Sequence, residues 1–342
     1  MISNILLILL LNTVLSIDNE GVFKVMTYNV RYADDVLRYG KDGKVTTRIR
    51  RVVKNIFHKN PDTIGFQEVT TEKKGYSSEW YNLLRLFLDK QYKGFGSGRS
   101  RHRKGEATPI FYNKNTLTLL ESGTKWLSPT PDVPGSVFPS THDHPTDGIP
   151  RVMTYGIFKR KADGVTYMHI NTHLDHKHYQ NRVSQIKVIT KFIEKYQHKF
   201  PILLTADFNS GNSTHAREKG DAIPYLLNHG FVSASLCPSA VRHWTYPAID
   251  YKSEIGRICK GRGYHKNHVS IDKQKYCDKY CDEERGIVID YILRAPTNKM
   301  YFNKYEVMTD YNICGGVSSD HYPVYAEGKI FDPNNMLNFL QY

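Results

Sequence analysis

The sequence has no long apolar run after residue 15, and it has no proline- or serine-rich linker, internal repeat or low-complexity segment. A helix needs about 20 consecutive apolar residues to cross a bilayer, so we expect no transmembrane segment. At roughly 150 residues per domain, a chain of 342 residues could hold two domains. Because no linker separates two halves, we predict a single domain over residues 17–342.

The apolar run at the start of the chain is too short to span a membrane. It extends from Ile5 to Leu15 and is followed by Ser16, a small residue at which a signal peptidase could cut. The Lys or Arg that usually precedes such a run is missing. We interpret residues 1–16 as a secretory signal peptide, with a buried strand or a membrane anchor as the alternatives. We therefore expect a secreted protein that begins near Ile17.

Cysteine is scarce, and its number is odd. The five cysteines are Cys237, Cys259, Cys277, Cys281 and Cys314. In a secreted protein they are candidates for disulfides, which leaves one thiol free or paired between chains. Cys277 and Cys281, with His265 and His268 nearby, could instead hold zinc, although an oxidising compartment favours a bridge. Three of the five lie in a segment of little periodicity, which we interpret as a Cys-rich insertion at about residues 253–286.

Acidic residues are outnumbered by basic ones. The chain has 34 Asp and Glu against 47 Lys and Arg, which gives a net charge of +13 and a pI near 9.3. Removal of residues 1–16 leaves this charge unchanged, since none of them is charged. A basic surface attracts polyanions through Coulomb forces and counterion release. This favours nucleic acid, anionic lipid or glycan as a partner without choosing among them, and solubility alone is the alternative.

Local patterns predict the main helices and one hairpin. Apolar residues recur at helical spacing in residues 46–57, 79–88 and 179–196, and Asn60 with Pro61 ends the first of these helices. Residues 109–112 form a predicted strand, and we expect residues 117–120 to be its hairpin partner.

Polar side chains follow three strongly apolar segments that we predict to be strands. Residues 22–28 lead to Asn29 and Arg31, and residues 63–66 lead to Glu68. Residues 201–206 lead to Asp207, with Asn209 two positions on. Working groups of α/β sheets lie at strand ends, and carboxylate and amide oxygens suit a hard cation. If these strands converge, they predict a divalent-metal site.

In the second half of the chain, histidines lie beside the ends of predicted strands. The strand predicted for residues 165–170 leads into Asn171 and His173, and a later segment sets His321 beside an acid just before another strand. Asp290 lies within the apolar segment 286–293, where a buried carboxylate needs a partner. We expect His321 to be that partner.

The densest basic patch is a glycine-flanked loop at residues 94–105. It contains Arg99, Arg101, Arg103 and Lys104. Such a loop can contact a phosphate backbone without reading its sequence, and a merely solvated loop is the alternative.

The ordered set of motifs resembles the endonuclease/exonuclease/phosphatase superfamily, a group of metal-dependent phosphoesterases that includes deoxyribonucleases, abasic-site endonucleases, deadenylases, inositol phosphatases and neutral sphingomyelinases. The motifs are Thr27-Tyr28-Asn29-Val30-Arg31, Gln67-Glu68, Asn171-Thr172-His173-Leu174-Asp175-His176, Ala206-Asp207-Phe208-Asn209, Ile289-Asp290-Tyr291 and Ser319-Asp320-His321. They span nearly all of the chain after residue 17. Two departures bear on substrate choice: the stretch after Arg99 is basic where the family pattern is acidic, and the insertion at 253–286 has no recognised counterpart.

The resemblance implies an α/β (α+β) four-layer sandwich, in which two mixed β-sheets pack face to face between outer helices and the site lies at one edge. It implies that Glu68 binds Mg²⁺ or Mn²⁺, with Asn29 close by and Asp320 as a second ligand or a water-mediated contact.

The resemblance also implies roles for the remaining site residues. Asp207 would orient or deprotonate the attacking water, and Asn209 would donate a hydrogen bond to a phosphate oxygen. His321, held by Asp290, would stabilise the transition state, and His173 would do the same or protonate the leaving oxygen. Which histidine is the acid stays open, because pKa values depend on burial. Further candidates for contact with the substrate phosphate are Arg31, Arg99, Arg101, Arg103, Asp175 and His176.

These features predict a secreted, divalent-metal-dependent phosphoesterase, most simply a phosphodiesterase or nuclease acting on nucleic acid. A sphingomyelinase-like or inositol-phosphatase-like enzyme acting on a phospholipid or small phosphate ester is the alternative, although we find no exposed apolar hairpin for a membrane. A third reading is a secreted binding protein that has lost catalysis. Such proteins usually lack a ligand or the histidine, and none is missing here.

Overall fold

The computed structural model describes residues 21–32, 44–72, 79–140, 148–211, 221–246, 287–297, 299–309 and 318–331. The predicted signal peptide and the insertion at 253–286 lie outside these residues, as do four of the five cysteines. The cysteine that is described, Cys237, is buried and forms no disulfide there. No helix among the described residues is long and apolar enough to cross a membrane.

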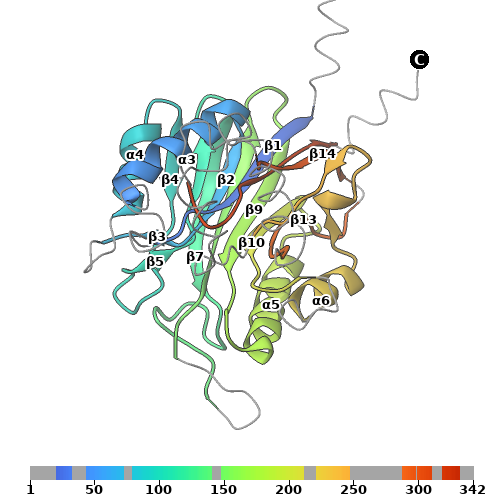
Figure 1. The fold of residues 1–342 in the computed structure, drawn as a ribbon. Coiled ribbons are helices and arrows are strands. Elements are labelled where there is room, and N and C mark those ends of the chain that lie inside the picture. Colours follow the sequence, from blue (N-terminus) through green and yellow to red (C-terminus); the bar gives the residue numbers. More distant parts are fainter. Residues whose placement is uncertain are drawn as a thin grey trace, which may run out of the picture.

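Two large sheets contain most of the strands, and each mixes parallel with antiparallel pairs (Figure 1). In spatial order, the strands of the first sheet are β12 (Ala240–Val241), β14 (Met300–Val307), β15 (Val324–Ile330), β1 (Val22–Asn29), β2 (Thr63–Gln67), β6 (Ile110–Asn113) and β4 (Tyr92–Phe95). Those of the second sheet are β11 (Val232–Ser233), β13 (Asp290–Arg294), β10 (Ile202–Asp207), β9 (Thr166–His173), β8 (Val152–Arg160) and β7 (Leu117–Trp126). A short ribbon pairs β3 (Val69–Thr70) with β5 (Glu106–Ala107).

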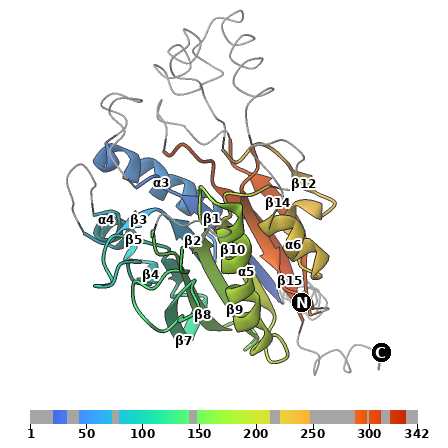
Figure 2. The same ribbon diagram turned by 90° about the horizontal axis from the view of Figure 1, so that it is seen from below.

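Helices cover the outer face of each sheet, as Figure 2 shows from below. The helices are α3 (Val45–Lys59), α4 (Trp80–Leu88), α5 (Tyr179–Glu194) and α6 (Ala222–Asn228), with one 3₁₀ turn, η2 (Ala234–Leu236). Apolar side chains of α3 and α4 pack on the first sheet, and those of α5 and α6 pack on the second. A third apolar layer fills the space between the sheets. The predicted four-layer sandwich is therefore confirmed.

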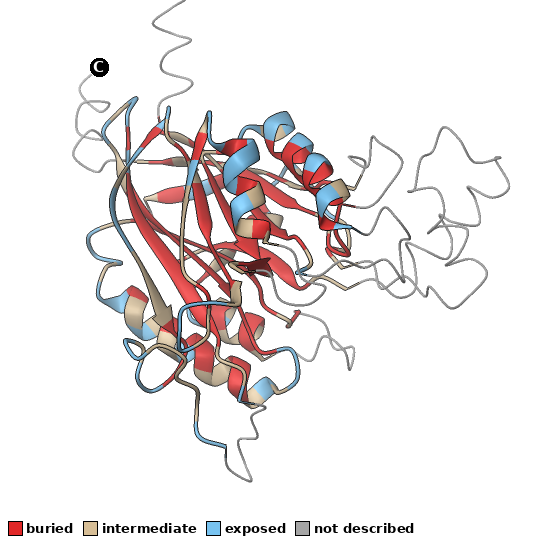
Figure 3. Cartoon of the chain, turned by 90° about the vertical axis from the view of Figure 1, so that its left-hand side faces the viewer, coloured by how far each residue is buried: buried red, intermediate tan, exposed pale blue. Residues whose placement is uncertain are grey.

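Burial explains why each helix forms where it does. The central strands of both sheets are buried along most of their length, edge strands such as β7 are largely exposed or half-buried, and each helix is buried on one side only (Figure 3). Helix α3 buries Ile49, Val52 and Ile56 on one stripe and ends at Asn60, whose φ of 47° reverses the chain before Pro61. The predicted start and end of this helix thus agree with the structure to within two residues.

The predicted hairpin between residues 109–112 and 117–120 is wrong. Strand β6 pairs with β2 and β4 of the first sheet, whereas β7 pairs with β8 of the second. The turn between them carries the chain from one sheet to the other, where Leu117 joins the apolar layer between the sheets. Sequence proximity favoured a hairpin, but in a sandwich two successive strands can belong to facing sheets.

A polar network crosses between the sheets beneath the strand ends. Gln67 of β2 donates hydrogen bonds to Thr27 of β1 at 2.9 Å and to Asn171 of β9 at 2.7 Å. The Thr205 hydroxyl of β10 also donates to Asn171, at 3.0 Å. Gly65 lets the sheets approach here, because a Cβ at this position would lie 2.2 Å from the Thr205 hydroxyl oxygen. The network fixes the two sheets relative to each other.

His169 ends this network as a neutral, buried imidazole. Because the Thr205 hydroxyl donates to Asn171, it must accept from His169 Nε2, at 2.7 Å. The other ring nitrogen, Nδ1, has no hydrogen-bond partner among the described residues. Burial lowers the pKa of His169 to about 3, from an ordinary value of 6.5.

We expect His169 to make the protein less stable in acid. Its pKa is lower in the folded than in the unfolded chain, so the unfolded chain binds the extra proton as the pH falls below about 6.5. The free energy of unfolding should then fall by up to about 1.4 kcal/mol per pH unit until the pH reaches the folded pKa. Urea titrations at several pH values should show a shallower dependence in His169→Gln. An identical pH dependence in both proteins would contradict this prediction.

Candidate active site

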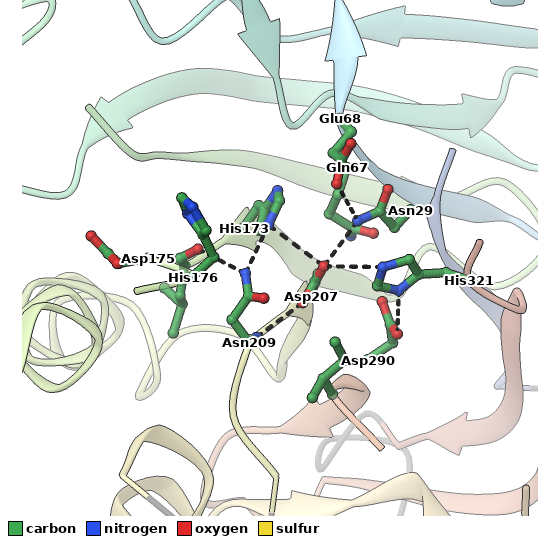
Figure 4. Close-up of polar contacts among 12 residues, drawn as sticks. Asn29, Gln67, Glu68, His173, Asp175, His176, Asp207, Asn209, Asp290 and His321 are labelled. Carbon is green, nitrogen blue, oxygen red and sulfur yellow. Dashed lines mark hydrogen bonds and ion pairs between the residues drawn. The ribbon is translucent and has the colours of Figure 1, made fainter. Parts of the chain in front are cut away.

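The strand ends of both sheets meet at one edge of the sandwich (Figure 4). In the first sheet, Asn29 at the end of β1 pairs with Gln67 at the end of β2, and Glu68 follows directly. In the second sheet, Asp207 pairs with His173 on one side and with Asp290 on the other. Two layers of polar residues therefore face each other where the apolar core between the sheets ends.

Asn29 connects the two layers. Its Nδ2 lies 3.1 Å from Glu68 Oε1 and 2.9 Å from Asp207 Oδ2. The second carboxylate oxygen of Glu68 accepts the backbone N–H of Tyr32 at 2.9 Å. The backbone after β1 is held in turn by the buried Arg48 of α3, which donates to the carbonyl of Val30 at 2.6 Å. The helix thus fixes the position of the loop that faces Glu68.

Asp207 lies between two imidazoles. Its Oδ2 is 3.5 Å from His173 Nε2 and 3.7 Å from His321 Nε2. The other nitrogen of His321, Nδ1, lies 2.8 Å from Asp290 Oδ2, so the predicted Asp290–His321 pair is present. The other oxygen of Asp207, Oδ1, accepts the backbone N–H of Asn209 at 2.9 Å. The side chains of Asp207, His173, Asp290 and His321 are buried, and Asn209 is half-buried.

The two imidazoles differ in charge because their surroundings differ. Burial opposes a charge on His321, but the carboxylate of Asp290 outweighs it and raises the pKa of His321 to about 10. Burial, together with the positive charges of Arg151 and Arg99, lowers the pKa of His173 well below its ordinary value. Near neutral pH, His321 is therefore an imidazolium and His173 is neutral. Sequence patterns left this distinction open.

Hydrogen bonds fix the tautomer of His173. The Asn209 side-chain amide donates to the Leu174 carbonyl at 3.1 Å and lies 2.9 Å from His173 Nε2. Since an amide nitrogen can only donate, Nε2 accepts and the proton of the neutral ring is on Nδ1.

Burial and the nearby charge of Asp290 raise the pKa of Asp207 to about 7, which suits a group that takes up a proton near neutral pH.

Three site residues other than glycine have left-handed backbones. Arg31, Glu68 and Asn209 have φ values of 58°, 60° and 48°. Such conformations cost an ordinary residue about 1 kcal/mol or more, and they cluster at functional sites where the surrounding structure imposes them. Each of the three directly follows, or follows within two residues, the end of a strand. The bend turns polar side chains of one sheet toward those of the other.

The donor atoms present fit a divalent cation. One ligand atom each from Glu68, His173 and Asp207 lies within 4.8 Å of the others, and a second such group comprises Asp207, Asp290 and His321. The first group combines two carboxylates with a neutral imidazole and has the Asn29 amide beside it, whereas the second contains a charged imidazole that cannot act as a ligand. The geometry therefore favours the side of Glu68. Asp320 lines the same pocket, and its Oδ2 lies 3.5 Å from Arg31 Nη1.

The residues predicted to contact phosphate fall into three groups. Arg31, Arg99 and His176 line the pocket of about 540 Å³ that also contains Asp207 and His321. Arg101 and Arg103 are exposed on the β4–β5 loop outside this pocket, and Arg103 stacks on Trp126 at 5.1 Å.

Asp175 holds the start of α5. Its Oδ1 accepts the backbone N–H groups of Lys177 at 2.7 Å and His178 at 2.9 Å, and its Oδ2 accepts the Asn181 amide. Burial opposes its charge, but these hydrogen bonds lower the pKa of Asp175. Contact of Asp175 with a substrate phosphate stays a prediction.

Two pocket residues were missed by the sequence patterns. Arg151 lies just before β8, is 5% exposed and lines the pocket. Tyr246 stacks against His321, with ring centroids 4.9 Å apart. The local sequence around Arg151 and Tyr246 does not show that either side chain reaches the pocket.

Solved structures share this architecture. An endonuclease/exonuclease/phosphatase from Bacteroides vulgatus matches with a TM-score of 0.67 and 23% identity, covering 91% of this chain and 99% of its own. A mannosyl-6-phosphatase from Bacteroides thetaiotaomicron matches with a TM-score of 0.65 and 22% identity, covering 90% of this chain and 100% of its own. TDP2 from D. rerio, solved with a single-strand DNA product, matches with a TM-score of 0.57 and 14% identity, covering 91% of this chain and 100% of its own.

No family model matches the chain, and no curated protein does. At the identities found, the structural matches show a common fold.

Proposed function

We propose that this chain, which has the endonuclease/exonuclease/phosphatase fold, is a divalent-metal-dependent phosphoesterase that hydrolyses phosphodiester bonds in nucleic acid. One observation carries the proposal: two carboxylates and a neutral imidazole, from Glu68, Asp207 and His173, lie within 4.8 Å of one another. Beside them a charged imidazole, His321, is held by Asp290. Such a set provides cation ligands, a proton acceptor and a positive charge at one point.

Glu68, with Asn29 beside it, would hold Mg²⁺ or Mn²⁺. When bound, such an ion supplies charge neutralisation at the phosphate and stabilises the oxyanion that develops there. Asp320, which lines the pocket across from these residues, would contact the ion through water.

The residues around the metal ligands would move the protons. Asp207, with its raised pKa, would orient the attacking water and take its proton. The His321 imidazolium would stabilise the pentacoordinate transition state and donate to the leaving oxygen, because it is the imidazole that carries a proton to give. His173 would act as a neutral hydrogen-bond donor through Nδ1, held in place by Asn209.

Charge supports nucleic acid as the substrate class. The chain has a net charge of +13, and Arg31, Arg99 and Arg151 line the pocket. The structurally similar TDP2 was solved with a DNA strand. The exposed Arg101 and Arg103 on the neighbouring loop would contact more distant phosphates.

The pure protein is expected to cleave plasmid and single-stranded DNA in the presence of Mg²⁺ and to lose this activity in EDTA. Gel electrophoresis over a time course measures the cleavage, and added Mn²⁺ or Mg²⁺ should restore it. Intact DNA at high enzyme concentration with either ion would contradict the proposal. Full activity in EDTA would contradict the metal requirement alone.

A small phosphate ester is the second candidate substrate. The specific observation is the similarity to a mannosyl-6-phosphatase, whose match is as extensive as that of the nuclease-like structures. Release of inorganic phosphate from a sugar phosphate, without cleavage of DNA, would decide for this alternative. Release of phosphocholine from sphingomyelin would indicate a lipid substrate, and binding of DNA without any hydrolysis would indicate a protein that has lost catalysis.

We also propose that the protein is secreted, on the apolar run at residues 5–15 alone. Recovery of a protein beginning near Ile17 from the culture medium would support this, and retention of residues 1–16 inside the cell would contradict it.

A further inference from the structure

Arg151 is a buried cation that forms no direct ion pair with a carboxylate of the described residues, although Glu106, Asp175 and Asp207 lie near enough to act on its charge. It is 5% exposed. Its Nη2 lies 3.0 Å from His176 Nδ1, while its Nε and Nη1 are buried and have no hydrogen-bond partner in the described part of the chain. Leaving a charged group in this state is costly for folding, so its presence in a pocket indicates a ligand that completes it.

The position of Arg151 separates it from the reaction centre. The residue precedes β8, and β9 lies between β8 and β10, which carries Asp207. Adjacent strands are about 4.8 Å apart, so the backbone of Arg151 is roughly 10 Å from that of Asp207. Its partner His176 lies beyond His173, on the side away from His321, as Figure 4 shows. The pocket therefore has two ends, one at His321 and one at Arg151.

Neighbouring charges make the Arg151 end suitable for an anion. Arg99 also lines the pocket, and its Nη2 is paired with Glu106 Oε1 at 2.7 Å. The carboxylate of Asp175 is occupied by the backbone of α5. Arg151, whose Nε and Nη1 form no hydrogen bond among the described residues, therefore has N–H groups left for a ligand.

We propose that Arg151, with His176 beside it, forms a second anion subsite that binds the phosphate next to the scissile one. This inference rests on the proposed function and narrows it, because it requires a substrate with two phosphates, such as a nucleic-acid strand, in place of a single phosphate ester. The subsite positions the strand, and the hydrolysis itself takes place at Asp207 and His321.

Matched dinucleotides test the subsite in the wild-type enzyme. Thymidine dinucleotides with no terminal phosphate, with a 5′-phosphate and with a 3′-phosphate share one scissile bond and differ only in the second anion. We expect one phosphorylated form to have a kcat/KM roughly 10- to 100-fold above that of the unphosphorylated form, as for a charge-assisted hydrogen bond. Equal kcat/KM values for all three would overturn the proposal.

The Arg151→Met variant should remove this preference. We expect the kcat/KM of the preferred dinucleotide, divided by that of the unphosphorylated form, to fall to about one, while bis(4-nitrophenyl) phosphate, which has no second anion, reports any effect on the reaction itself. Arg151→Lys should keep part of the preference, and Arg85→Met, on the exposed face of α4, should keep all of it. An equal loss on every substrate would place Arg151 at the scissile phosphate and contradict the subsite.

Two further measurements distinguish the subsite from a purely structural role of Arg151 and from the proposed hydrolysis. Because removal of an unpaired buried cation relieves strain, Arg151→Met should have a Tm at or above that of wild type, whereas a merely structural arginine would give a lower Tm. Calorimetry in EDTA should show tighter binding of thymidine 3′,5′-bisphosphate than of thymidine 5′-phosphate, with the difference lost in Arg151→Met. If this holds in a protein that cleaves no DNA, the subsite stands and the proposed hydrolysis fails.

Discussion

Asp207→Asn is expected to lower kcat for DNA cleavage by a factor of roughly 10³–10⁴, because it removes the proton acceptor. The side chain keeps its shape, so its carbonyl oxygen can still accept from the backbone N–H of Asn209, while the hydrogen bond from Asn29 to the other oxygen is lost. The loss should therefore appear in kcat and leave the fold intact. Steady-state kinetics with saturating Mg²⁺ measure it.

The thermal stability of Asp207→Asn shows whether a loss of activity comes from the chemistry or from unfolding. Asp207 is buried, and burial together with Asp290 raises its pKa, which means that its charge opposes folding. Asp207→Asn should then unfold at a Tm no lower than that of wild type near neutral pH. The exposed Asp132, paired with Lys125 far from the strand ends, provides the control, and Asp132→Asn should retain activity within about twofold. An active Asp207→Asn enzyme would remove the basis of the mechanism.

Asp290→Asn is expected to lower activity by roughly 10²–10³-fold and to move the alkaline limit of the pH profile. In the wild type, the Asp290 carboxylate keeps His321 protonated up to a pKa of about 10. If the imidazolium is the active form, activity falls as the pH rises through that value. Without the carboxylate the pKa of His321 decreases, so the fall should shift toward the ordinary value of about 6.5. A pH series of kcat/KM measures both limbs.

A second histidine variant completes this test. His321→Gln should remove the alkaline limb altogether and leave activity at or below that of Asp290→Asn, since the carboxylate acts through the imidazole. His198→Gln, at an exposed position after α5, should leave the profile unchanged. An unchanged alkaline limit in Asp290→Asn would show that another group, such as the leaving oxygen, sets it. His321 would then no longer be the acid.

The fold was predictable in its local parts. Apolar spacing placed α3 and α5 to within about two residues of their observed ends, because the pattern of buried side chains in a helix is set by its own neighbours in sequence. The predicted β6–β7 hairpin was wrong because the pairing of strands depends on residues that are far apart in the sequence. Nothing in the local pattern of residues 109–120 states whether two successive strands share a sheet or face each other across the core.

The candidate site was also predictable only in part. Its carboxylates and imidazoles were identifiable as polar residues where apolar strands end, and Asp290 was correctly matched with His321 from the need of a buried acid for a partner. The position of Asp175 in its motif did not reveal that the α5 backbone occupies one of its oxygens. Arg151 was missed because an arginine at the start of a strand is usually exposed.

By itself the sequence determined the elements, the order of the polar strand ends and the excess of positive charge, since these depend on residues close together in the chain. Only the tertiary structure decided that Glu68 and Asp207 face each other and that His321 is charged while His173 is neutral. It also decided that two buried nitrogens of Arg151 have no hydrogen-bond partner among the described residues. The reason is physical: a pKa and an unmet hydrogen bond are set by burial and by groups on other strands, which come together only when the two sheets pack.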